Sequence, residues 1–466
     1  MAEAFENCGD AGAFFYDGYT ASKVVYNLIL QLYHRGHEGA GIASHDGHGI
    51  RLHKRVGRAR DIFSDALLTE ELPGNVAIGH TRYGTVGLDR PELFLHPLRA
   101  PDGSFYIAHN GTIAPYELEE LLREFPDGSA FDTRVLAALL QRNLFETNGD
   151  WVETLSRSSE RLDGSYTCTL LTSDGKLIAF REPRGFKPLN YGELPEGYVV
   201  ASETSALKAV GARNVKPVRS GEMIIIDESG LRKEQFAESK PTPCSFEPVY
   251  FSRYSSVFDG LSCSDVRIGL GRRLAEQYPV DVNFVGPVPD SGRAAAVGFS
   301  HESGIPLHEV LEINREVGRV FILPPWMRDA AMKQKYLPIE SVVEGKSLVL
   351  TDDSIVRGET TRSVIGILRD AGAKEVHVRI TFPPISFPCL HGGVAFASRS
   401  ELAINKFGGK EGVRKYINAD SLEYTTVDDL ELVGIRNACH ACVDGKYPLN
   451  HVPDFDTALR LGLVSG

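Results

Sequence analysis

The segment 348–362, LVLTDDSIVRGETTR, carries the clearest potential for chemistry in the chain. An apolar run ends in two adjacent carboxylates, Asp352 and Asp353, and a short loop then leads into a helix-like stretch. In an open α/β sheet, ligands bind at the carboxyl ends of strands, and a helix N-terminus offers N–H groups to phosphate. Adjacent carboxylates can hold ribose hydroxyls or Mg²⁺. The segment therefore predicts recognition of a ribose 5-phosphate.

The same loop holds residues suited to phosphate. Gly358 lets the backbone approach a ligand closely, and the threonines after it add hydroxyl donors. Alone, an Asp-Asp pair is compatible with a simple turn and a capped helix. The complete segment resembles the phosphoribosyl pyrophosphate (PRPP) motif of type I phosphoribosyltransferases, and it is most similar to that of the amidophosphoribosyltransferases. The resemblance implies a PRPP-binding set of Asp352, Asp353, Ser354, Arg357, Gly358, Thr360 and Thr361.

A second candidate, Cys8, lies near the start of the chain and is followed by Gly9. A cysteine at a chain terminus can act as a nucleophile with its own α-amine as the general base. Cys8 becomes terminal only if residues 1–7 are removed, as a propeptide would be. Considered alone, Cys8 could also be a small buried residue.

Three downstream segments resemble glutamine amidotransferase domains of the N-terminal nucleophile (Ntn) type: HRGHEGAGI (34–42), GHTRYGT (79–85) and AHNGTI (108–113). Such domains release ammonia from glutamine through a cysteine nucleophile. The resemblance therefore assigns Cys8 a catalytic role and implies that residues 1–7 are a propeptide.

Physical roles follow for four residues of this half. Arg82 can clamp the glutamine α-carboxylate through a bidentate pair, and Asp132 can hold the α-ammonium group. Asn110 through its side chain and Gly111 through its backbone N–H can form the oxyanion hole. We therefore expect Cys8, Asn110 and Gly111 to be the catalytic group of the glutaminase reaction.

The resemblance to amidophosphoribosyltransferases extends over nearly the whole chain. It includes the segments 180–192, 198–207, 288–295, 314–322, 342–358 and 446–451. It implies a pentosyltransferase in which ammonia from glutamine attacks C1 of PRPP and pyrophosphate departs. The product would be 5-phospho-β-D-ribosylamine, and the reaction would be the first committed step of purine synthesis.

The resemblance further implies that the loop from about Asn314 to Lys335 closes over PRPP. A closing lid excludes water from the reaction. The chain departs from many members of the family at Ile313, Glu316 and Gly292, which puts PRPP affinity and metal contacts in question. Two kinds of group are candidates to neutralise the pyrophosphate charge. One is Mg²⁺, for which Asp352 and Asp353 are the expected ligands and Ser291 a doubtful one. The other is a set of cations, Arg315, Arg319 and Lys335.

Four cysteines could form a metal site. Cys439 and Cys442 form a C-x-x-C, Cys244 lies in a proline-rich stretch, and Cys389 follows a proline-rich turn. Four thiolates suit zinc and an iron–sulfur cluster equally, and the spacing does not separate them. The resemblance to the cluster-bearing, propeptide-bearing branch of the family implies a [4Fe–4S] cluster. Cys168 matches none of the ligand positions and is expected in a core strand.

The elements around these residues fall into two groups. Residues 8–235 contain short strand-like runs at 165–172, 176–180, 198–202 and 222–227, and helix-like runs at 116–125 and 132–146. This mix indicates a layered α+β unit, and the resemblance implies the αββα glutaminase fold. We expect a glutamine amidotransferase domain at 8–235, with Asp132 as a helix N-cap.

After a proline-rich stretch at 240–248 the pattern changes to alternating strands and helices. Strand-like runs at 280–289, 346–353 and 376–382 are separated by helix-like runs, including 361–373. This order is typical of a parallel doubly wound sheet. We expect an α/β type I phosphoribosyltransferase domain at 245–466, with a cluster-binding segment at its C-terminal end.

Composition limits the function classes. The chain has 466 residues and a formal net charge of −12, which argues against binding nucleic acid through bulk positive charge. No apolar run suggests a membrane span, and no secretory or transit signal precedes Cys8, so a cytoplasmic location is the default. The family suggests glutamine, PRPP and inhibitory purine nucleotides as ligands. It also suggests a homo-oligomer with four copies.

Two other functions fit only part of the chain. Glucosamine-phosphate synthases share the front half, but they would need sugar-isomerase domains where this chain has DDSIVRGETT. A PRPP-sensing regulator would have no need of Cys8 or of the glutaminase segments. The amidotransferase interpretation accounts for both halves.

Overall fold

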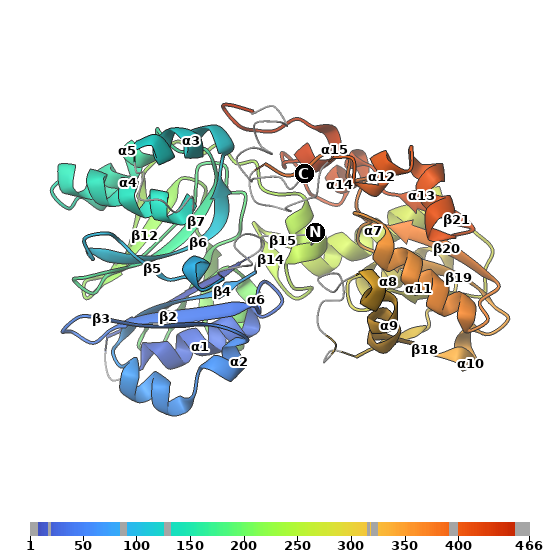
Figure 1. Cartoon of the computed structure of the whole chain (residues 1–466), viewed down its shortest axis with the longest axis horizontal. Helices are drawn as coiled ribbons and strands as arrows, with labels where there is room; N and C mark the ends of the chain where they lie inside the picture. The colour runs from blue at the N-terminus through green and yellow to red at the C-terminus, as the bar shows by residue number, and fades with distance from the viewer. Residues whose placement is uncertain are drawn as a thin grey trace.

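The computed structural model describes residues 8–16, 20–83, 91–124, 132–314, 317, 325–390 and 399–452. Several predicted features lie outside these residues: the propeptide 1–7, Arg315, Glu316 and Arg319. Within the described part, two halves lie side by side (Figure 1). The N-terminal half ends with β13, and the C-terminal half begins with the short helix η3.

Two stacked antiparallel sheets form the centre of the N-terminal half. The first has the order β11-β9-β10-β1-β4-β2-β3 and the second has the order β13-β12-β8-β7-β6-β5. The strands are β1 (Gly9–Phe15), β2 (Gly39–His45), β3 (Ile50–Val56), β4 (Val76–Arg82), β5 (Leu98–Arg99), β6 (Phe105–Ile113), β7 (Gly164–Thr172), β8 (Leu177–Phe180), β9 (Asn190–Leu194), β10 (Gly197–Ala201), β11 (Arg213–Pro217), β12 (Glu222–Asp227) and β13 (Gly230–Gln235).

Helices cover the outer face of each sheet. Ala11, Ala13 and Phe15 of β1 pack on the helical side, whereas Phe14 points into the core between the sheets. This alternation is the period of two expected for a strand with two buried faces. The helices on the first sheet are α1 (Ala21–Gln31), α2 (Ala59–Ile62), η1 (Leu67–Glu71) and α6 (Thr204–Ala209); those on the second are α3 (Pro115–Glu124), α4 (Asp132–Glu146) and α5 (Trp151–Ser159).

A parallel sheet with the order β16-β19-β20-β21 forms the centre of the C-terminal half. Its strands are β16 (Phe284–Pro287), β19 (Ser347–Asp352), β20 (Glu375–Ile380) and β21 (Ser421–Tyr424). Val349 packs toward α7 (Cys263–Gln277) and α8 (Arg293–Ser303). Leu348 and Leu350 pack toward α11 (Glu359–Asp370) and α13 (Lys410–Ile417). Helices on both faces are the expected cover for a parallel sheet.

Smaller elements complete the two halves. They are η2 (Pro91–Phe94), η3 (Glu247–Phe251), β14 (Val257–Phe258), β15 (Leu261–Ser262), β17 (Leu311–Ile313), α9 (Pro325–Lys335), β18 (Tyr336–Pro338), α10 (Glu340–Val343), α12 (Ala403–Lys406), α14 (Val427–Leu432) and α15 (Ala441–Asp444). β14 pairs with β15, and β17 pairs with β18, each as an antiparallel pair.

Buried ion pairs join the two halves. Arg35, which follows α1, donates to Glu203 at 2.5 Å and also to Glu247 of η3. The Arg253 N–H donates to the same Glu203 carboxylate at 2.9 Å. Because each buried charge has a partner of opposite sign, burial is tolerated, and removal of one partner would leave an unpaired charge. A second link is the bidentate pair from Arg181 to Asp259 in the β14–β15 turn, at 2.7 Å for each bond.

The predicted elements agree with the structure except in two details. The run 280–289 forms a strand only over Phe284–Pro287, because the neighbouring strand β19 begins at Ser347 and offers no earlier ladder partner. Asp132 was predicted as the N-cap of a helix, and it is instead the first helical residue of α4. Among the described residues, none of the helices combines the length and apolar character needed to cross a bilayer.

Candidate active sites

Cys8 immediately precedes β1, which lies in the first sheet between β10 and β4. Its side chain is half-buried. The register pairs Gly9 with Thr81, so continuing it by one residue brings Cys8 beside Arg82 at the end of β4. The Asp10 N–H donates to Ser202 Oγ at 2.9 Å and ties this end of β1 to the end of β10. The candidate nucleophile therefore sits on a strand fixed from both sides.

Asn110 and Gly111 lie in β6, in the second sheet, and β6 contacts both β1 and β4 across the sheet interface. The Asn110 side chain is 1% exposed, and neither of its amide atoms has a hydrogen-bond partner in the described part of the chain. An unpartnered buried amide is costly, so the site suits a ligand that accepts its N–H. Gly111 has φ +153°, and a Cβ there would lie 2.0 Å from Ser165 O.

Arg82 lies at the end of β4, in the first sheet, and Asp132 lies at the start of α4, which covers the second sheet. Arg82 is 6% exposed, and its guanidinium lies 5.2 Å from the centre of the Phe94 ring. The Asp132 carboxylate accepts the backbone N–H of Thr133 at 2.7 Å and that of Ile113 at 3.3 Å. Since Ile113 lies two residues after Gly111 in β6, one strand connects Asp132 to the predicted oxyanion residues.

A buried polar cluster that the sequence analysis did not single out lies near Arg82. It contains Asp10, His80, His96 and His109, all less than 6% exposed. His80 Nε2 lies 3.9 Å from Asp10 Oδ1 and 3.3 Å from His96 Nδ1. Burial lowers the pKa of His80 to about 3 and that of His96 well below its ordinary value, so both rings are neutral at pH 7. Burial likewise raises the pKa of Asp10.

The acidic pair of the second site lies at the carboxyl end of β19, at the ligand edge of the parallel sheet. Both carboxylates are buried, at 6% and 5% exposed for Asp352 and Asp353. Asp352 accepts the Ser291 hydroxyl at 2.9 Å, and Asp353 accepts the Ser354 hydroxyl. Burial and the charge of Asp353 raise the pKa of Asp352, and burial raises the pKa of Asp353. A cation or sugar hydroxyls would relieve this cost.

The loop after the pair turns sharply into α11. Gly358 is the N-cap with φ +82°, a left-handed conformation that favours glycine. Thr361 is buried and Thr360 is exposed. Arg357 forms an ion pair with Glu401 at 3.5 Å, so the predicted phosphate ligand is held by a carboxylate of the same half.

The departure at Gly292 has a steric reason. A Cβ at this position would lie 2.1 Å from Thr351 O, and the Thr351 hydroxyl donates to Gly292 O at 2.9 Å. The backbone of this loop therefore packs directly on β19 and leaves no room for a serine. The neighbouring Ser291 already supplies a hydroxyl to Asp352.

The predicted lid begins and ends in a short ladder. Ile313 of β17 pairs with Tyr336 of β18, and the Asn314 N–H donates to Lys335 O at 2.8 Å. Ile313 packs against the core, which explains an apolar residue at this departure. Lys335 Nζ lies 5.7 Å from the centre of the Tyr336 ring. The ladder places both ends of the lid together beside the acidic pair, whose charges contribute to a raised pKa for Tyr336.

The four candidate thiol ligands converge from three segments. Cys244 pairs with Cys439 in an isolated parallel bridge, and the Cys439 N–H donates to Pro243 O at 2.8 Å. Burial raises the pKa of Cys442 well above its ordinary value, and the charges of Cys244, Cys439 and Cys389 act in the same direction. No disulfide links them. In the described residues, no group of three or more donors is arranged to hold a single metal ion.

The other two cysteines have structural positions. Cys168 is buried in β7 opposite His109, in the core beneath α4 and α5, as the sequence analysis expected. Cys263 is buried at the start of α7.

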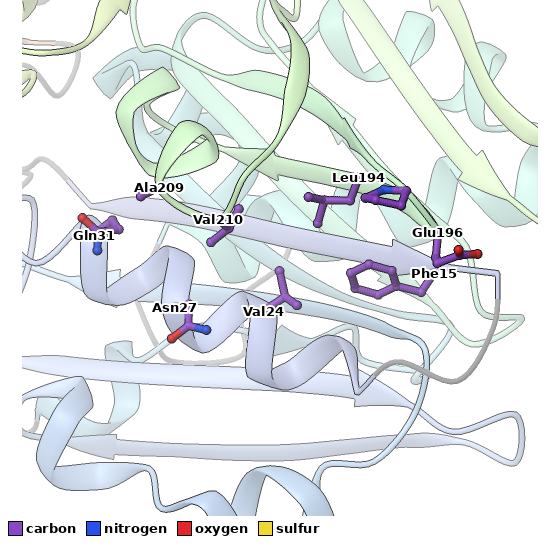
Figure 2. Close-up of a pocket in the computed structure, with 9 residues that line it drawn as sticks. Phe15, Val24, Asn27, Gln31, Leu194, Glu196, Ala209 and Val210 are labelled. Carbon is purple, nitrogen blue, oxygen red and sulfur yellow. The ribbon is translucent and has the colours of Figure 1, made fainter.

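Two surface cavities lie away from the candidate glutamine and PRPP residues. One, of 430 Å³, lies between α1 and the β9–β10 turn, where Val24, Asn27 and Gln31 of α1 face Leu194 and Glu196 (Figure 2). The other, of 440 Å³, lies between the halves and borders Cys244. Neither contains a predicted residue of the glutamine or PRPP sites.

Comparisons with known proteins decide the family. A family model described as a glutamine amidotransferase domain matches residues 88–209. The chain is 40% identical over 458 residues to the amidophosphoribosyltransferase of Archaeoglobus fulgidus, covering 95% of this chain and 98% of that protein. It is 38% identical over 463 residues to the Bacillus subtilis amidophosphoribosyltransferase, covering 95% and 94%. The chain belongs to the amidophosphoribosyltransferase family.

A solved structure of a family member extends the match to three dimensions. Glutamine PRPP amidotransferase from Bacillus subtilis, complexed with ADP and GMP, superposes with a TM-score of 0.85 at 36% identity, covering 96% of this chain and 98% of that one. The fold is thus an Ntn glutaminase unit followed by a phosphoribosyltransferase unit with a parallel sheet. As an amidophosphoribosyltransferase, the chain transfers the amide nitrogen of glutamine to PRPP, the first step of purine biosynthesis.

Proposed function

We propose that Cys8, Asn110, Gly111, Arg82 and Asp132 carry out the glutaminase step of this reaction. After removal of residues 1–7, the Cys8 α-amine takes the thiol proton, and the sulfur attacks the amide carbon of glutamine. The tetrahedral intermediate collapses, the carbon–nitrogen bond breaks, and ammonia leaves with the returned proton. Water then hydrolyses the thioester to glutamate. Arg82 and Asp132 hold the α-carboxylate and α-ammonium groups throughout.

One observation carries this proposal: the buried Asn110 amide has no partner among the described residues. Its N–H group is preorganised for an oxyanion, and the Gly111 N–H follows it on the same strand. Donors that are fixed before the reaction stabilise charge in the transition state without reorganisation.

The Asn110→Ala variant tests the proposal. Removal of one oxyanion donor is expected to lower glutamine-dependent kcat by about 10²–10³-fold. Activity with ammonium chloride in place of glutamine should stay at the wild-type rate, since it bypasses this site. Glutamine-dependent turnover within about twofold of wild type would contradict the role of Asn110. An intact mass that begins at Met1 or Ala2 would remove the α-amine of Cys8 from the mechanism.

For the second step we propose that PRPP binds between the acidic pair and the α11 N-terminus. Asp352 and Asp353 contact the ribose hydroxyls, and Ser354, Gly358, Thr360 and Thr361 surround the 5-phosphate. The nitrogen of ammonia attacks C1, the bond from C1 to the pyrophosphate oxygen breaks, and pyrophosphate leaves. We propose that phosphate charge is neutralised by Arg357, Arg315, Arg319 and Lys335. In the structure Arg357 forms an ion pair with Glu401.

A magnesium ion fits this site. Mg²⁺ is commonly bound by one or two carboxylates together with substrate phosphates. The buried carboxylates of Asp352 and Asp353, whose pKa values are raised by burial, provide such a pair. When bound, the ion would neutralise pyrophosphate charge. Ser291 is engaged by Asp352 and is the weaker candidate ligand.

We also propose a [4Fe–4S] cluster on Cys244, Cys389, Cys439 and Cys442. Four thiols that lie close enough to influence one another provide the donor set. Four thiolates also suit zinc, and the resemblance to the cluster-bearing members of the family favours the cluster. Native mass of anaerobically purified protein should show four irons and four sulfides, and one zinc would refute the cluster.

The remaining proposals follow from the family. The glutamine amidotransferase domain spans 8–235 and the phosphoribosyltransferase domain spans 245–466, consistent with the end of β13 and the start of η3. Since the Bacillus subtilis structure contains ADP and GMP, purine nucleotides are proposed as inhibitors. A cytoplasmic homo-oligomer, with four copies as the family suggests, is proposed as the working form.

A further inference from the structure

The segment 447–451, here called the C-terminal strap, crosses from the C-terminal half onto the N-terminal half. It follows α15, which lies on the C-terminal half with α14 (Figure 1). The Asn450 N–H donates to Asp163 Oδ2 at 2.5 Å, and Arg184 Nη2 donates to the Asn450 side-chain oxygen at 3.3 Å. His451 Nδ1 lies 3.0 Å from Glu117 Oε1. Asp163, Arg184 and Glu117 belong to the N-terminal half.

Asp163 anchors the corner at which β7 begins. It is 5% exposed, and its Oδ1 accepts the Gly164 N–H at 2.8 Å and Arg184 Nε at 3.3 Å. Its backbone oxygen accepts the Ala114 N–H at 2.8 Å, just after the end of β6. A buried carboxylate needs donors on both oxygens, and the strap supplies the donor to Oδ2.

This corner forms one wall of the predicted oxyanion hole. Gly164 and Ser165 pair with Ile113 and Thr112 of β6. The Ser165 carbonyl is the group against which Gly111 packs, since a Cβ at Gly111 would lie 2.0 Å from it. A shift of the 163–165 backbone would therefore move the peptide that carries the oxyanion donor.

The contact between His451 and Glu117 lies on the α3 side of the turn between β6 and α3. Glu117 lies in α3, three residues after Ala114, and is 8% exposed. Its contact with His451 fixes the start of α3 relative to the end of β6. The two contacts together brace the chain on either side of the β6–α3 turn.

We propose that the C-terminal strap positions Asn110 and Gly111 for oxyanion stabilisation, so that the last described residues of the phosphoribosyltransferase half complete the glutaminase site. The base of the strap is held beside the thiol ligands: the Ser386 and Phe387 N–H groups donate to Cys442 O, and the Tyr447 hydroxyl donates to Pro388 O, next to Cys389. The thiol site thereby acts on glutamine hydrolysis through this strap. This inference rests on the oxyanion role proposed above for Asn110 and Gly111.

The matched pair Asn450→Pro and Asn450→Ala tests the strap in the full chain. Proline removes the N–H that Asp163 accepts, whereas alanine keeps it and removes only the side chain. We expect Asn450→Pro to lower glutamine-dependent kcat by about tenfold, the size expected for one lost hydrogen bond to a charged group. The KM for glutamine should change less than kcat, because the variant leaves the Arg82 and Asp132 side chains themselves in place. Asn450→Ala should stay within about threefold of wild type.

Ammonia-dependent activity separates positioning from general damage. It should be unchanged in both variants, and a proportional loss of both activities would overturn the inference. Equal glutamine kinetics for the proline and alanine variants would overturn it as well. Should Asn450→Pro not fold, His451→Ala takes its place, with the same selective loss of glutamine-dependent kcat expected. A parallel measurement on Asn110→Ala separates a failure of the proposed function from a failure of this inference. Normal glutamine turnover in Asn110→Ala would refute the proposed role of Asn110. Normal glutamine turnover in the strap variants alone would refute the role of the strap.

Discussion

The two candidate sites are organised in different ways. At the glutamine site, Asn110 lies in the middle of a strand, buried between two sheets, with its amide unpartnered among the described residues. At the PRPP site, Asp352 and Asp353 lie at a strand end, and neighbouring hydroxyls already satisfy part of their hydrogen-bonding capacity. The first site is prepared for charge that develops during a reaction. The second is prepared for a charged ligand that must displace its present partners.

This difference indicates which kind of substitution should impair each site most. In a strand between two covered sheets, a small steric change has no space to relax, so geometry limits activity. At a loop on a sheet edge, the backbone can adjust, and the charge of the acids limits activity instead. The following substitutions test the contrast in order of expected effect.

Gly111→Ala should have the largest effect. Its Cβ would lie 2.0 Å from Ser165 O, in a backbone conformation with φ +153° that favours glycine. Displacement of the donor peptide should lower glutamine-dependent kcat by about 10²–10³-fold. Ammonia-dependent activity should remain, and steady-state assays with each nitrogen source make the comparison. Intact glutamine turnover in this variant would show that the backbone around Gly111 can move without loss of activity. Geometry would then not limit the glutamine site more than the PRPP site.

Asp352→Asn should lower kcat/KM for PRPP by about a hundredfold while stabilising the C-terminal half. The pKa of Asp352 is raised in the folded state by burial and by Asp353, so the folded protein binds this proton more tightly than the unfolded chain. Ionisation therefore costs stability as the pH rises through the raised pKa, and the neutral amide removes that cost. We expect an unfolding midpoint about 2–4 °C higher at pH 7.5, by calorimetry.

A control for this prediction is Glu411→Gln on α13. Glu411 is exposed, and its hydrogen bond from Arg414 lowers its pKa, so its ionised form is slightly stabilising. Its amide variant should not raise the midpoint. If Asp352→Asn also fails to raise it, the acidic pair is not a source of strain in the free protein.

Gly358→Ala should have the smallest effect. The nearest atoms to its Cβ, on Tyr416 and Ile417, would be at 3.4–3.5 Å, which is ordinary contact, so only the left-handed backbone conformation opposes the change. A cost of about 1 kcal/mol should raise the KM for PRPP about fivefold. Gly47→Ala is the matched control, with φ +87° and no atom within 4 Å, and should lose similar stability without a change in KM.

The sequence predicted well the strands and helices that carry the candidate site residues. The DDSIVRGETT segment is contiguous, and the strand, loop and helix that it predicted are β19 and α11. The four thiol positions, named from a resemblance, lie close enough to influence one another, and their role as ligands stays a prediction. The reason for the departure at Gly292 is its contact with Thr351 O, which depends on how a loop packs on β19 and so cannot be read from the local sequence.

What could not be predicted involves residues brought together from distant positions. Asp10 and His80 form a buried pair only because β1 and β4 are neighbours, and neither residue has a distinctive local motif. Arg35 was noted within HRGHEGAGI, but its partners Glu203 and Glu247 follow from the docking of the halves. A signal for such partners would be paired substitutions across related chains rather than any pattern within one.

The bond from Asn450 to Asp163 also has a consequence for the order of biosynthesis. The two residues are separated by 287 positions. At about 5–20 residues per second, a ribosome needs roughly 15–60 s to make the intervening chain. During that interval the nascent glutaminase unit lacks the donor that the strap supplies to Asp163. A chain terminated before Asn450 would then release ammonia about tenfold more slowly, as expected for Asn450→Pro, so that little ammonia forms where no PRPP site can use it.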